Sequence, residues 1–292
     1  MDTPLPARPL RVALVQNDAG ADADENLAWI ASCLPPAGAC DLVALPEVFA
    51  RRSDDAAYRA AAEPRDGPLA GWLARQAVAR QAWVLAGSII ERDGVAVYNT
   101  SLLFDRDGRL VAAYRKIHLF EARLDNGHTI RERDVYEPGD APVLAVIDGW
   151  RCGLSICYDV RFPELYRLYA QDGAALLACP ANFTQRTGRD HWETLVRARA
   201  IENQCFVIAP DQCGANPATH CRSHGHSLAV GPWGEMLAAA ADEPAVLHVT
   251  LDPALLRETR RRVPSLEHRR LGAGSHSDRF ARKQDNERQP RP

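Results

Sequence analysis

Lysine is almost missing from this chain of 292 residues. Of its 35 basic residues only two are lysines, Lys116 and Lys283, and all the others are arginines. Most positions that need a positive charge accept either side chain, but lysine has a compact ammonium group whose pKa can shift, whereas the guanidinium group of arginine is wider, planar and permanently charged. Because Lys116 lies mid-chain in the segment YRKIHLF (114–120), we expect a position where arginine does not serve. The alternative at this point is chance, since two lysines have to stand somewhere.

The chain also lacks long apolar runs, a secretory signal and paired cysteines. No run approaches the roughly 18 apolar residues of a membrane span, and the opening MDTPLPARPL has an acidic second residue and three prolines where a signal peptide would carry an apolar stretch. The eight cysteines form no Cys-x-x-Cys pair, and in a chain without a leader they are expected to be reduced thiols rather than disulfides. These features predict a cytoplasmic protein with no membrane partner.

The net charge gives no reason to expect a polyanionic partner. It is only −3, so neither a nucleic acid nor an anionic membrane is favoured as partner. The exception is the C-terminal end, where residues 257–292 hold eleven basic and five acidic residues. That charge lacks the regular interleaving with aromatic and glycine residues that marks nucleic-acid binding. We therefore expect a solvated basic tail at 276–292.

Short apolar runs alternate with amphipathic helical patterns along the whole chain. Several runs are apolar on both faces, as in strands covered by a layer on each side. This alternation predicts an α/β layered fold, and because no repeat or linker divides the chain, we expect one domain over residues 1–275. The predicted strands are 10–17, 41–47, 82–90, 96–104, 109–116, 142–147, 151–157, 174–180, 204–210, 225–230 and 245–251, and the predicted helices are 24–34, 68–80, 162–172, 189–203 and 253–262.

One cysteine stands where a nucleophile is expected. In GLSICYDVRFPEL an apolar strand runs into Cys157 and a helix begins a few residues later, which is the kind of sharp turn that exposes a reactive side chain. A buried structural cysteine is the alternative, and it is the interpretation we adopt for Cys33, Cys179 and Cys205. A catalytic thiol also needs a base or a cation close by, because little of it is ionised at neutral pH.

Two other strand ends carry the charged groups that such a thiol requires. In DLVALPEVFA a buried strand ends in Pro46-Glu47, which places a carboxylate at the carboxyl edge of the sheet. A glutamate that caps a helix is the alternative. The segment YRKIHLF ends another predicted strand with Lys116.

The segments LPEVF, YRKIHLF and ICYDVRFPEL, in this order and spacing, resemble the three signature regions of the nitrilase, or carbon–nitrogen hydrolase, superfamily. HWETLVRARAIENQCFVIAPDQCG and GHSLAVGPWGE extend the resemblance over roughly residues 10–270. The resemblance implies a four-layer α-β-β-α sandwich that usually forms dimers. It also implies a catalytic triad of Glu47, Lys116 and Cys157, with Glu132 as a second glutamate near the lysine.

The implied reaction is a hydrolysis through a thioester. Cys157 attacks a carboxamide carbonyl, while Glu47 takes the thiol proton and later gives one to the departing ammonia. The Lys116 ammonium group and the backbone N–H of Tyr158 stabilise the oxyanion, and Glu132 orients Lys116 and keeps it protonated. Water deprotonated by Glu47 then hydrolyses the thioester, so no metal and no organic cofactor is expected.

Three further residues are candidates for substrate binding. Arg161, four residues after Cys157, offers a planar fork for a substrate carboxylate, and a salt bridge to Glu164 is its alternative. Asn182 and Phe183 follow a predicted strand, at the edge where α/β folds place ligand contacts. For these two the alternative is a loop without function.

Two segments need separate mention. THCRSHGH holds three histidines and a cysteine within 220–226, but their spacing is not that of a zinc finger and part of the segment overlaps the GHS strand of the superfamily, so we expect no metal there. Gly231 in VGPWG stands where relatives commonly carry aspartate, and the loop 121–129 differs from that of many amidases. Both differences bear on pocket shape or subunit packing.

Within the superfamily, Cys-Tyr-Asp after the strand resembles the amide-cleaving branches, and RARAIENQC and RRVPSLEHRR resemble the branch of deaminated glutathione amidase and ω-amidase. We therefore expect an amidase that converts a small carboxamide, an ω-amide of an α-keto acid or a deaminated-glutathione-like compound, into an acid and ammonia. Alternatives are a hydrolase of N-carbamoyl amino acids or aliphatic amides, and a thiol or metal sensor built on the surplus cysteines. A non-catalytic scaffold is a further alternative, against which the intact triad argues.

Overall fold

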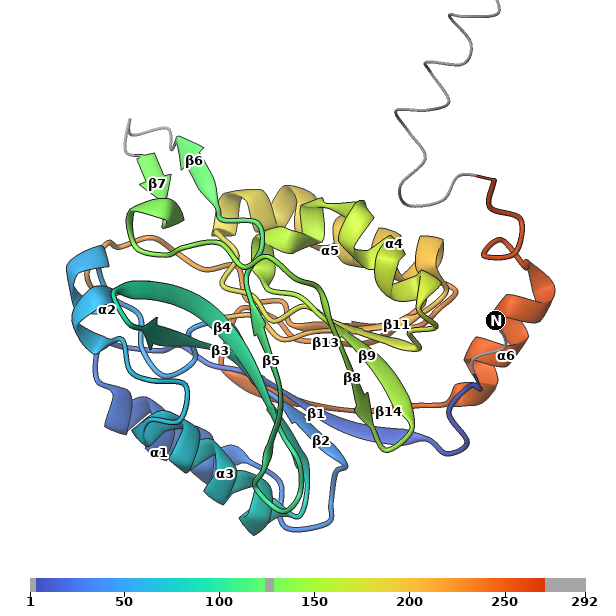
Figure 1. Ribbon diagram of the computed structural model, residues 1–292, viewed down its shortest axis with the longest axis horizontal. Helices are drawn as coiled ribbons and strands as arrows, with labels where there is room; N and C mark the ends of the chain where they lie inside the picture. Colours follow the sequence, from blue (N-terminus) through green and yellow to red (C-terminus); the bar gives the residue numbers. More distant parts are fainter. Residues whose placement is uncertain (1–3, 124–128, 271–292) are drawn as a thin grey trace, which may run out of the picture.

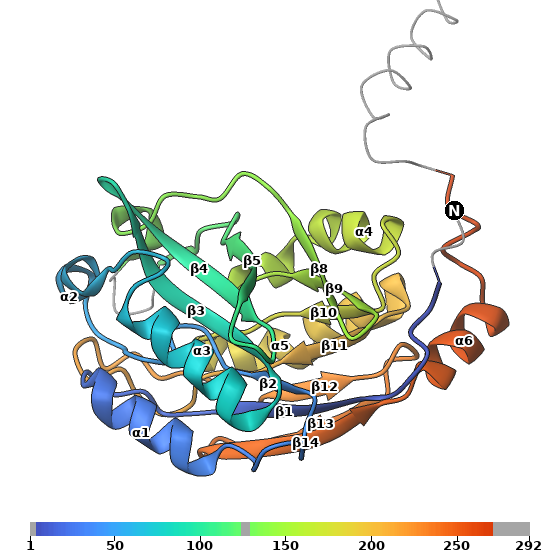
Figure 2. The ribbon, with the colours of Figure 1, turned by 60° about the horizontal axis from the view of Figure 1, so that its bottom comes forward.

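The computed structural model describes residues 4–123 and 129–270. Two six-stranded sheets lie face to face, and helices cover the outer face of each, as Figure 1 and Figure 2 show. The expected four-layer α-β-β-α sandwich is thereby confirmed. The basic tail expected at 276–292 lies outside the described residues. Within the described ranges, no helix is long and apolar enough to cross a membrane.

The first sheet is organised around three parallel strands. Its order is β14 (Ala245–Leu251), β1 (Leu10–Gln16), β2 (Leu42–Ala44), β3 (Trp83–Asp93), β4 (Ala96–Phe104) and β5 (Leu110–Arg115), and its outer helices are α1 (Ala23–Cys33) and α3 (Pro68–Arg80). Along β1, Val12 and Leu14 face the core between the sheets, while Ala13 and Val15 face the core beneath the helices. A layer on each side explains why this strand is apolar at nearly every position.

The second sheet repeats the plan. Its order is β13 (Met236–Ala239), β12 (Leu228–Val230), β11 (Phe206–Ala209), β10 (Leu176–Ala178), β9 (Trp150–Leu154) and β8 (Val143–Ile147), and its outer helices are α4 (Pro163–Gln171) and α5 (Gln185–Asn203). Strands β9, β10 and β11 are parallel. On α5, Trp192, Val196 and Ala200 recur at four-residue spacing and are buried in the large core, so the helix packs through one face.

Sequence reasoning missed one short α-helix and three short strands. They are α2 (Asp55–Ala61), β6 (Glu121–Arg123), β7 (Thr129–Arg131) and β13. None of them contains a fully buried residue, and because apolar periodicity reflects burial, such elements leave little pattern to detect. The opposite case is α6 (Pro253–Arg262), which has the predicted bounds because Asp252 caps it, its carboxylate accepting a hydrogen bond of 2.8 Å from the backbone N–H of Ala254.

The absence of an aspartate at position 231 has a local cause. A side chain added at Gly231 would collide with the carboxylate of Glu235. One oxygen of Glu235 accepts a hydrogen bond of 3.0 Å from the backbone N–H of Trp233. Glu235 therefore provides a carboxylate at this turn from a different position, and that carboxylate would have to move to admit a side chain at position 231.

The topology brings several strand ends to one place. Glu47 follows β2 and Lys116 follows β5 in the first sheet, while Cys157 follows β9 and Asn182 follows β10 in the second. Carboxyl ends of parallel strands share an edge of their sheet, and α/β folds place ligands at that edge. The two sheets therefore contribute jointly to one site.

Candidate active site

Cys157 lies at a sharp turn between a strand and a helix. Strand β9 ends at Leu154, and the 3-10 helix η2 (Cys157–Arg161) begins directly at the cysteine. Cys157 has φ of 49°, in the left-handed region, where a non-glycine residue costs about 1–3 kcal/mol. Its backbone N–H donates a hydrogen bond of 2.8 Å to the carbonyl of Pro180 after β10. The neighbouring strand therefore holds the turn that sequence reasoning expected here.

Glu47 is buried and fixed by neighbours on both sheets. Its Oε1 accepts a hydrogen bond of 2.8 Å from the side-chain amide of Asn99 on β4, and its Oε2 accepts one of 2.8 Å from the backbone N–H of Asn182. The chain reaches this position closely packed against β3, since a side chain at Gly87 would collide with the carbonyls of Leu45 and Pro46. These contacts leave the carboxylate one orientation.

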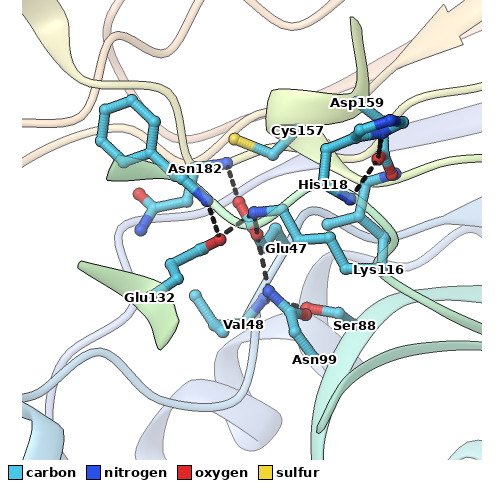
Figure 3. Close-up of polar contacts among 12 residues, drawn as sticks. Glu47, Val48, Ser88, Asn99, Lys116, His118, Glu132, Cys157, Asp159 and Asn182 are labelled. Carbon is cyan, nitrogen blue, oxygen red and sulfur yellow. Dashed lines mark hydrogen bonds and ion pairs between the residues drawn. The ribbon is translucent and has the colours of Figure 1, made fainter. Parts of the chain in front are cut away.

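The residue after Glu47 is also constrained. Val48 has φ of 48°, which is unfavourable for a β-branched residue, and its backbone N–H donates a hydrogen bond of 3.0 Å to the hydroxyl of Ser88 on β3 (Figure 3). Left-handed backbone at both Val48 and Cys157 marks the two turns that carry the carboxylate and the thiol.

Lys116 is fully buried between two carboxylates. Its Nζ lies 2.9 Å from Oε1 of Glu47 and 2.8 Å from Oε1 of Glu132, and the side chain has no exposed surface. Glu132 opens the 3-10 helix η1 (Glu132–Asp134), and its Oε2 accepts a hydrogen bond of 2.7 Å from the backbone N–H of Phe120. Figure 3 shows these side chains together with Cys157. The glutamate that the resemblance implied near the lysine is thus in contact with it.

The charges of this cluster influence one another strongly. Burial lowers the pKa of Lys116, but Glu132 and Glu47 outweigh that effect and raise it well above its usual range. Burial, and then the charge of Glu47, raise the pKa of the Cys157 thiol well above its usual range, although Lys116 and the backbone N–H of Asn182 act in the opposite direction. The lysine is therefore a cation at neutral pH, and the resting thiol keeps its proton until a base removes it.

Glu132 belongs to the same electrostatic unit. Burial raises the pKa of its carboxyl group, the charge of Lys116 lowers it, and the charge of Glu47 raises it again, with a net rise. Two carboxylates thus share one fully buried ammonium group. Such a cluster is expensive to bury, which makes a role in chemistry a better explanation for it than stability.

A cavity of about 720 Å³ opens over these residues. Cys157, Glu47 and Glu132 line it, together with three residues singled out from the sequence: Tyr158, Asn182 and Phe183. Its farther walls carry two exposed arginines, Arg131 and Arg222, two tyrosines, Tyr58 and Tyr136, and a second thiol, Cys221.

Arg161 lies beside the cavity and does not line it. Its guanidinium group sits 5.7 Å from the ring centre of Tyr158 and 5.3 Å from that of Phe183, and its Nη1 is 3.3 Å from Nδ1 of His191. Its polar contact is therefore with His191 rather than with Glu164, the alternative partner considered from the sequence. A role in binding a substrate carboxylate stays a prediction.

The histidines of the segment 220–226 include a stacked pair. The rings of His224 and His226 stack with centres 4.2 Å apart, and burial lowers the pKa of His224 to about 4. In the described part of the chain, no three His, Cys, Asp or Glu side chains are grouped as metal ligands. The stacked pair packs against α5, because a side chain at Gly188 would collide with the ring of His224.

Sequence reasoning missed two polar residues of the site. Asn99 contacts Glu47 from within an apolar strand, and Asp159 is completely buried two residues after Cys157. The available signal was the polar residue itself, since a buried amide or carboxylate is found where it has hydrogen-bond partners. The sequence pattern did not indicate which residues would be the hydrogen-bond partners of Asn99 and Asp159.

Comparisons with known proteins agree with this geometry. The family model of carbon–nitrogen hydrolases matches residues 11–261. A deaminated glutathione amidase from Yersinia enterocolitica is 38% identical over 266 residues, covering 89% of this chain and 93% of the relative. The chain belongs to the carbon–nitrogen hydrolase family. Omega-amidase NIT2 from Bos taurus is 35% identical over 262 residues, covering 89% of this chain and 95% of the relative.

Solved structures place this carbon–nitrogen hydrolase among nitrilase-superfamily folds. Nit3 from Saccharomyces cerevisiae superimposes with a TM-score of 0.82 at 29% identity, covering 93% of this chain and 100% of that chain. An amidase from Nesterenkonia sp. superimposes with a TM-score of 0.70 at 25% identity, covering 88% of this chain and 98% of that chain, and in it acrylamide has added to the active-site cysteine. The protein is accordingly an enzyme that hydrolyses carbon–nitrogen bonds outside peptides.

Proposed function

We propose that this carbon–nitrogen hydrolase is an amidase in which Cys157 is the nucleophile, Glu47 the general base and acid, and Lys116 the cation that stabilises the oxyanion. The observation that carries the proposal is the Glu47–Lys116–Glu132 cluster beside a thiol on a strained turn, at a cavity that Glu47, Glu132 and Cys157 line. The adduct on the cysteine of the Nesterenkonia amidase supports the choice of nucleophile. A non-catalytic scaffold would have no reason to keep this cluster buried.

The first half of the reaction makes a thioester. Glu47 accepts the proton of Cys157 as the sulfur attacks the carbonyl carbon of the amide, and the carbonyl π electrons move onto oxygen. The Lys116 ammonium group and the backbone N–H of Tyr158 hold that oxygen. When the tetrahedral intermediate collapses, the C–N bond breaks and Glu47 gives its proton to the leaving nitrogen.

The second half regenerates the thiol. Glu47 deprotonates a water molecule that attacks the thioester carbon, the C–S bond breaks as the carboxylic acid forms, and Glu47 returns the proton to the sulfur. Two hydrogen bonds, from Asn99 and from the backbone of Asn182, keep the Glu47 carboxylate aimed in one direction through both halves. Glu132 contributes by fixing the ammonium group of Lys116 through its 2.8 Å contact.

For the substrate we propose an ω-amide of an α-keto acid or a deaminated-glutathione-like compound. Two curated relatives named for such activities support this choice. The cavity of about 720 Å³ is within the size range of sites that enclose a whole small molecule. The candidate partners of an acidic substrate are three arginines: Arg222 on the cavity wall, Arg131 also on the cavity wall and 3.4 Å from Glu121, and Arg161 beside the cavity.

We also propose that the enzyme is a homodimer. Ile201, Trp233 and Val263 are each about half exposed. They lie near one another, since Ile201 is next to Gly234 and the guanidinium group of Arg262 lies 4.8 Å from the ring centre of Trp233. A group of apolar side chains on a surface favours a protein contact. Light scattering after gel filtration should give twice the chain mass of 32.1 kDa. A mass of one chain contradicts this part of the proposal and leaves the chemistry untouched.

A substrate panel tests the function. Release of ammonia should be fastest with acidic ω-amides, and slower with aliphatic amides, N-carbamoyl amino acids and nitriles. Iodoacetamide should label Cys157 first, and substrate should protect it. Cys221 is the internal control because it lines the same cavity, so inactivation that follows the labelling of Cys221 contradicts the assignment of the nucleophile.

A further inference from the structure

Cys157 and Lys116 come from different sheets, so the sandwich alone does not fix their relative position. Lys116 follows β5 at an edge of the first sheet, and Cys157 follows β9 in the second. Stabilisation of an oxyanion requires its donors to lie within a few tenths of an ångström of their places. Side chains that cross from one sheet to the other near these two residues are therefore of special interest.

Asp159 makes such a crossing. It is completely buried, two residues after Cys157 in η2. Its Oδ2 accepts hydrogen bonds of 2.8 Å from the backbone N–H of Ile156 and 2.7 Å from the hydroxyl of Tyr114. Its Oδ1 accepts one of 3.1 Å from the backbone N–H of His118 and lies 2.7 Å from Nδ1 of the same histidine.

The partners of Asp159 are neighbours, in the sequence, of the two reactive residues. Ile156 directly precedes Cys157, and Tyr114 and His118 stand two residues on either side of Lys116. The His118 ring is itself held, because it stacks on Phe162 with centres 3.7 Å apart and an angle of 6°. Figure 3 shows the His118–Asp159 pair close to Lys116 and Cys157.

Capping the short helix does not account for this arrangement. The cap at Ile156 uses one hydrogen bond to one oxygen, while the remaining contacts reach the segment around Lys116 on the other sheet. The carboxylate has four donor groups around it, so both oxygens are occupied. An asparagine at this position would replace one of the two accepting oxygens with an NH2 group. That NH2 group would then meet a backbone N–H, so that two donors face each other.

We propose that Asp159 is a positioning residue that fixes the ammonium group of Lys116 relative to the sulfur of Cys157 across the two sheets. The proposal rests on the proposed roles of Cys157 and Lys116. Asp159 does not touch the substrate. Its contribution appears in the transition state, where the lysine has to meet a charge that the ground state does not carry.

Two tyrosines provide a matched test. Tyr114→Phe removes a buried hydroxyl that donates to Asp159 and accepts from the backbone N–H of Ile117 at 3.4 Å. Tyr169→Phe removes another buried hydroxyl, which donates to the carbonyl of Leu154 and accepts from the backbone N–H of Val143 at 3.1 Å, so its bonds join α4 to the second sheet alone. Each variant loses one hydrogen bond that the hydroxyl donates and one that it accepts, but only the first loses a connection between the two sheets.

Asp159→Asn and Tyr114→Phe should lower kcat while KM stays within about two- to three-fold, because substrate binding is retained and transition-state stabilisation is lost. We expect about a hundred-fold loss for Asp159→Asn and about ten-fold for Tyr114→Phe, per molecule of enzyme titrated by iodoacetamide. The pH dependence of Cys157 alkylation should move to higher pH in both, because Lys116 no longer offsets the rise in the thiol pKa. Tyr169→Phe should change neither kcat nor that profile.

The outcomes separate clearly. Equal losses of kcat in Tyr114→Phe and Tyr169→Phe, or an unchanged alkylation profile in Tyr114→Phe, overturn the proposal and leave Asp159 as a structural cap. Tyr114→Phe decides the matter if Asp159→Asn does not fold. A wild-type enzyme that releases no product from any amide instead overturns the proposed function, which these variants do not address.

Discussion

Arg115 and Lys116 are consecutive residues at the end of β5, and they stand in contrasting environments. Arg115 is a quarter exposed, and its fork contacts Glu91 twice, at 3.1 and 2.7 Å, and Asp93 at 2.7 Å. Its guanidinium group also lies 3.7 Å from the ring centre of Tyr98. Lys116 is fully buried and meets Glu47 and Glu132 through a single nitrogen.

The contrast shows what each cation is suited for. A guanidinium group bridges carboxylates in one plane and stacks on an aromatic ring, which suits the structural network around Glu91. Burial raises the pKa of Glu91, but hydrogen bonds from Arg115 and Thr100 outweigh it and lower the pKa overall. An ammonium group is a point charge, so it can face two carboxylates, a thiol and a developing oxyanion from one small volume. In the proposed mechanism, this is the physical reason for a lysine at 116 in a chain whose other basic residues, Lys283 apart, are arginines.

Removing the sulfur should have the largest effect, because in the proposed mechanism the charges around Lys116 act only on a reaction that Cys157 begins. Cys157→Ala is expected to abolish turnover and to leave the fold and the oligomeric state intact, since alanine disturbs little packing at this turn. Steady-state assays and circular dichroism check the two parts. Residual activity above about one part in a thousand of wild type contradicts a covalent role.

Exchanging the two cations should produce the next largest effect. Lys116→Arg is expected to lose about a hundred- to a thousand-fold in kcat, nearly as much as Lys116→Ala, because a wide planar group does not fit where a point charge is needed. Arg115→Lys should cost about 1–2 kcal/mol of stability, measured by thermal unfolding, with little change in kcat. Equal losses of kcat in Lys116→Arg and Arg115→Lys contradict the distinction between the two positions.

A third comparison concerns the arginines that can meet an acidic substrate. Two variants test them: Arg222→Gln on the cavity wall and Arg161→Lys beside the cavity. Each is expected to lower kcat/KM for acidic ω-amides. The loss should be about ten-fold for the arginine that binds the substrate carboxylate. Neutral short amides, which lack that carboxylate, should be hydrolysed as before. Equal losses for acidic and neutral amides in both variants contradict a carboxylate-binding role for either arginine.

The smallest expected effect concerns the pH dependence of stability. It arises from a buried carboxyl group that forms no ion pair within the described residues. Asp211 is completely buried, its Oδ1 accepts a hydrogen bond of 2.9 Å from the backbone N–H of Phe183, and its Oδ2 has no hydrogen-bond partner in the described residues. Burial raises its pKa well above its usual range. A carboxyl group whose pKa is higher in the folded state stabilises the fold fully at a pH below its pKa in the unfolded state. This stabilisation is lost as the pH rises through its pKa in the folded state.

Asp211→Asn should therefore gain melting temperature relative to wild type as pH rises from 4 to 8, by about 2 to 4 °C. Asp41→Asn is the opposite control. Burial raises the pKa of Asp41 but Arg11 outweighs it and lowers it overall, so this carboxyl group adds stability above its unfolded pKa that is lost as pH falls. The stability lost in Asp41→Asn should be greatest at neutral pH. Parallel trends in the two variants contradict these assignments.

The sequence by itself determined the layered α/β class, the superfamily and the positions of Glu47, Lys116 and Cys157. These rest on short-range patterns, namely apolar runs that end in a charged or reactive residue and motifs of a few contiguous letters. The helices 68–80 and 253–262 were predicted with their final bounds for the same reason. Caps and periodicity are local properties of the chain.

Only the tertiary structure decided which groups surround those three residues. The backbone N–H that orients Glu47 belongs to Asn182, 135 positions away, and Asp159 reaches Tyr114 across 45 positions. Arg161 has His191 as its polar contact, and not Glu164 close by in sequence, because α5 passes beside the turn. Hydrogen bonds and ion pairs depend on distances of about 3 Å between atoms, and for distant segments those distances are set by how the two sheets pack, which no local pattern encodes.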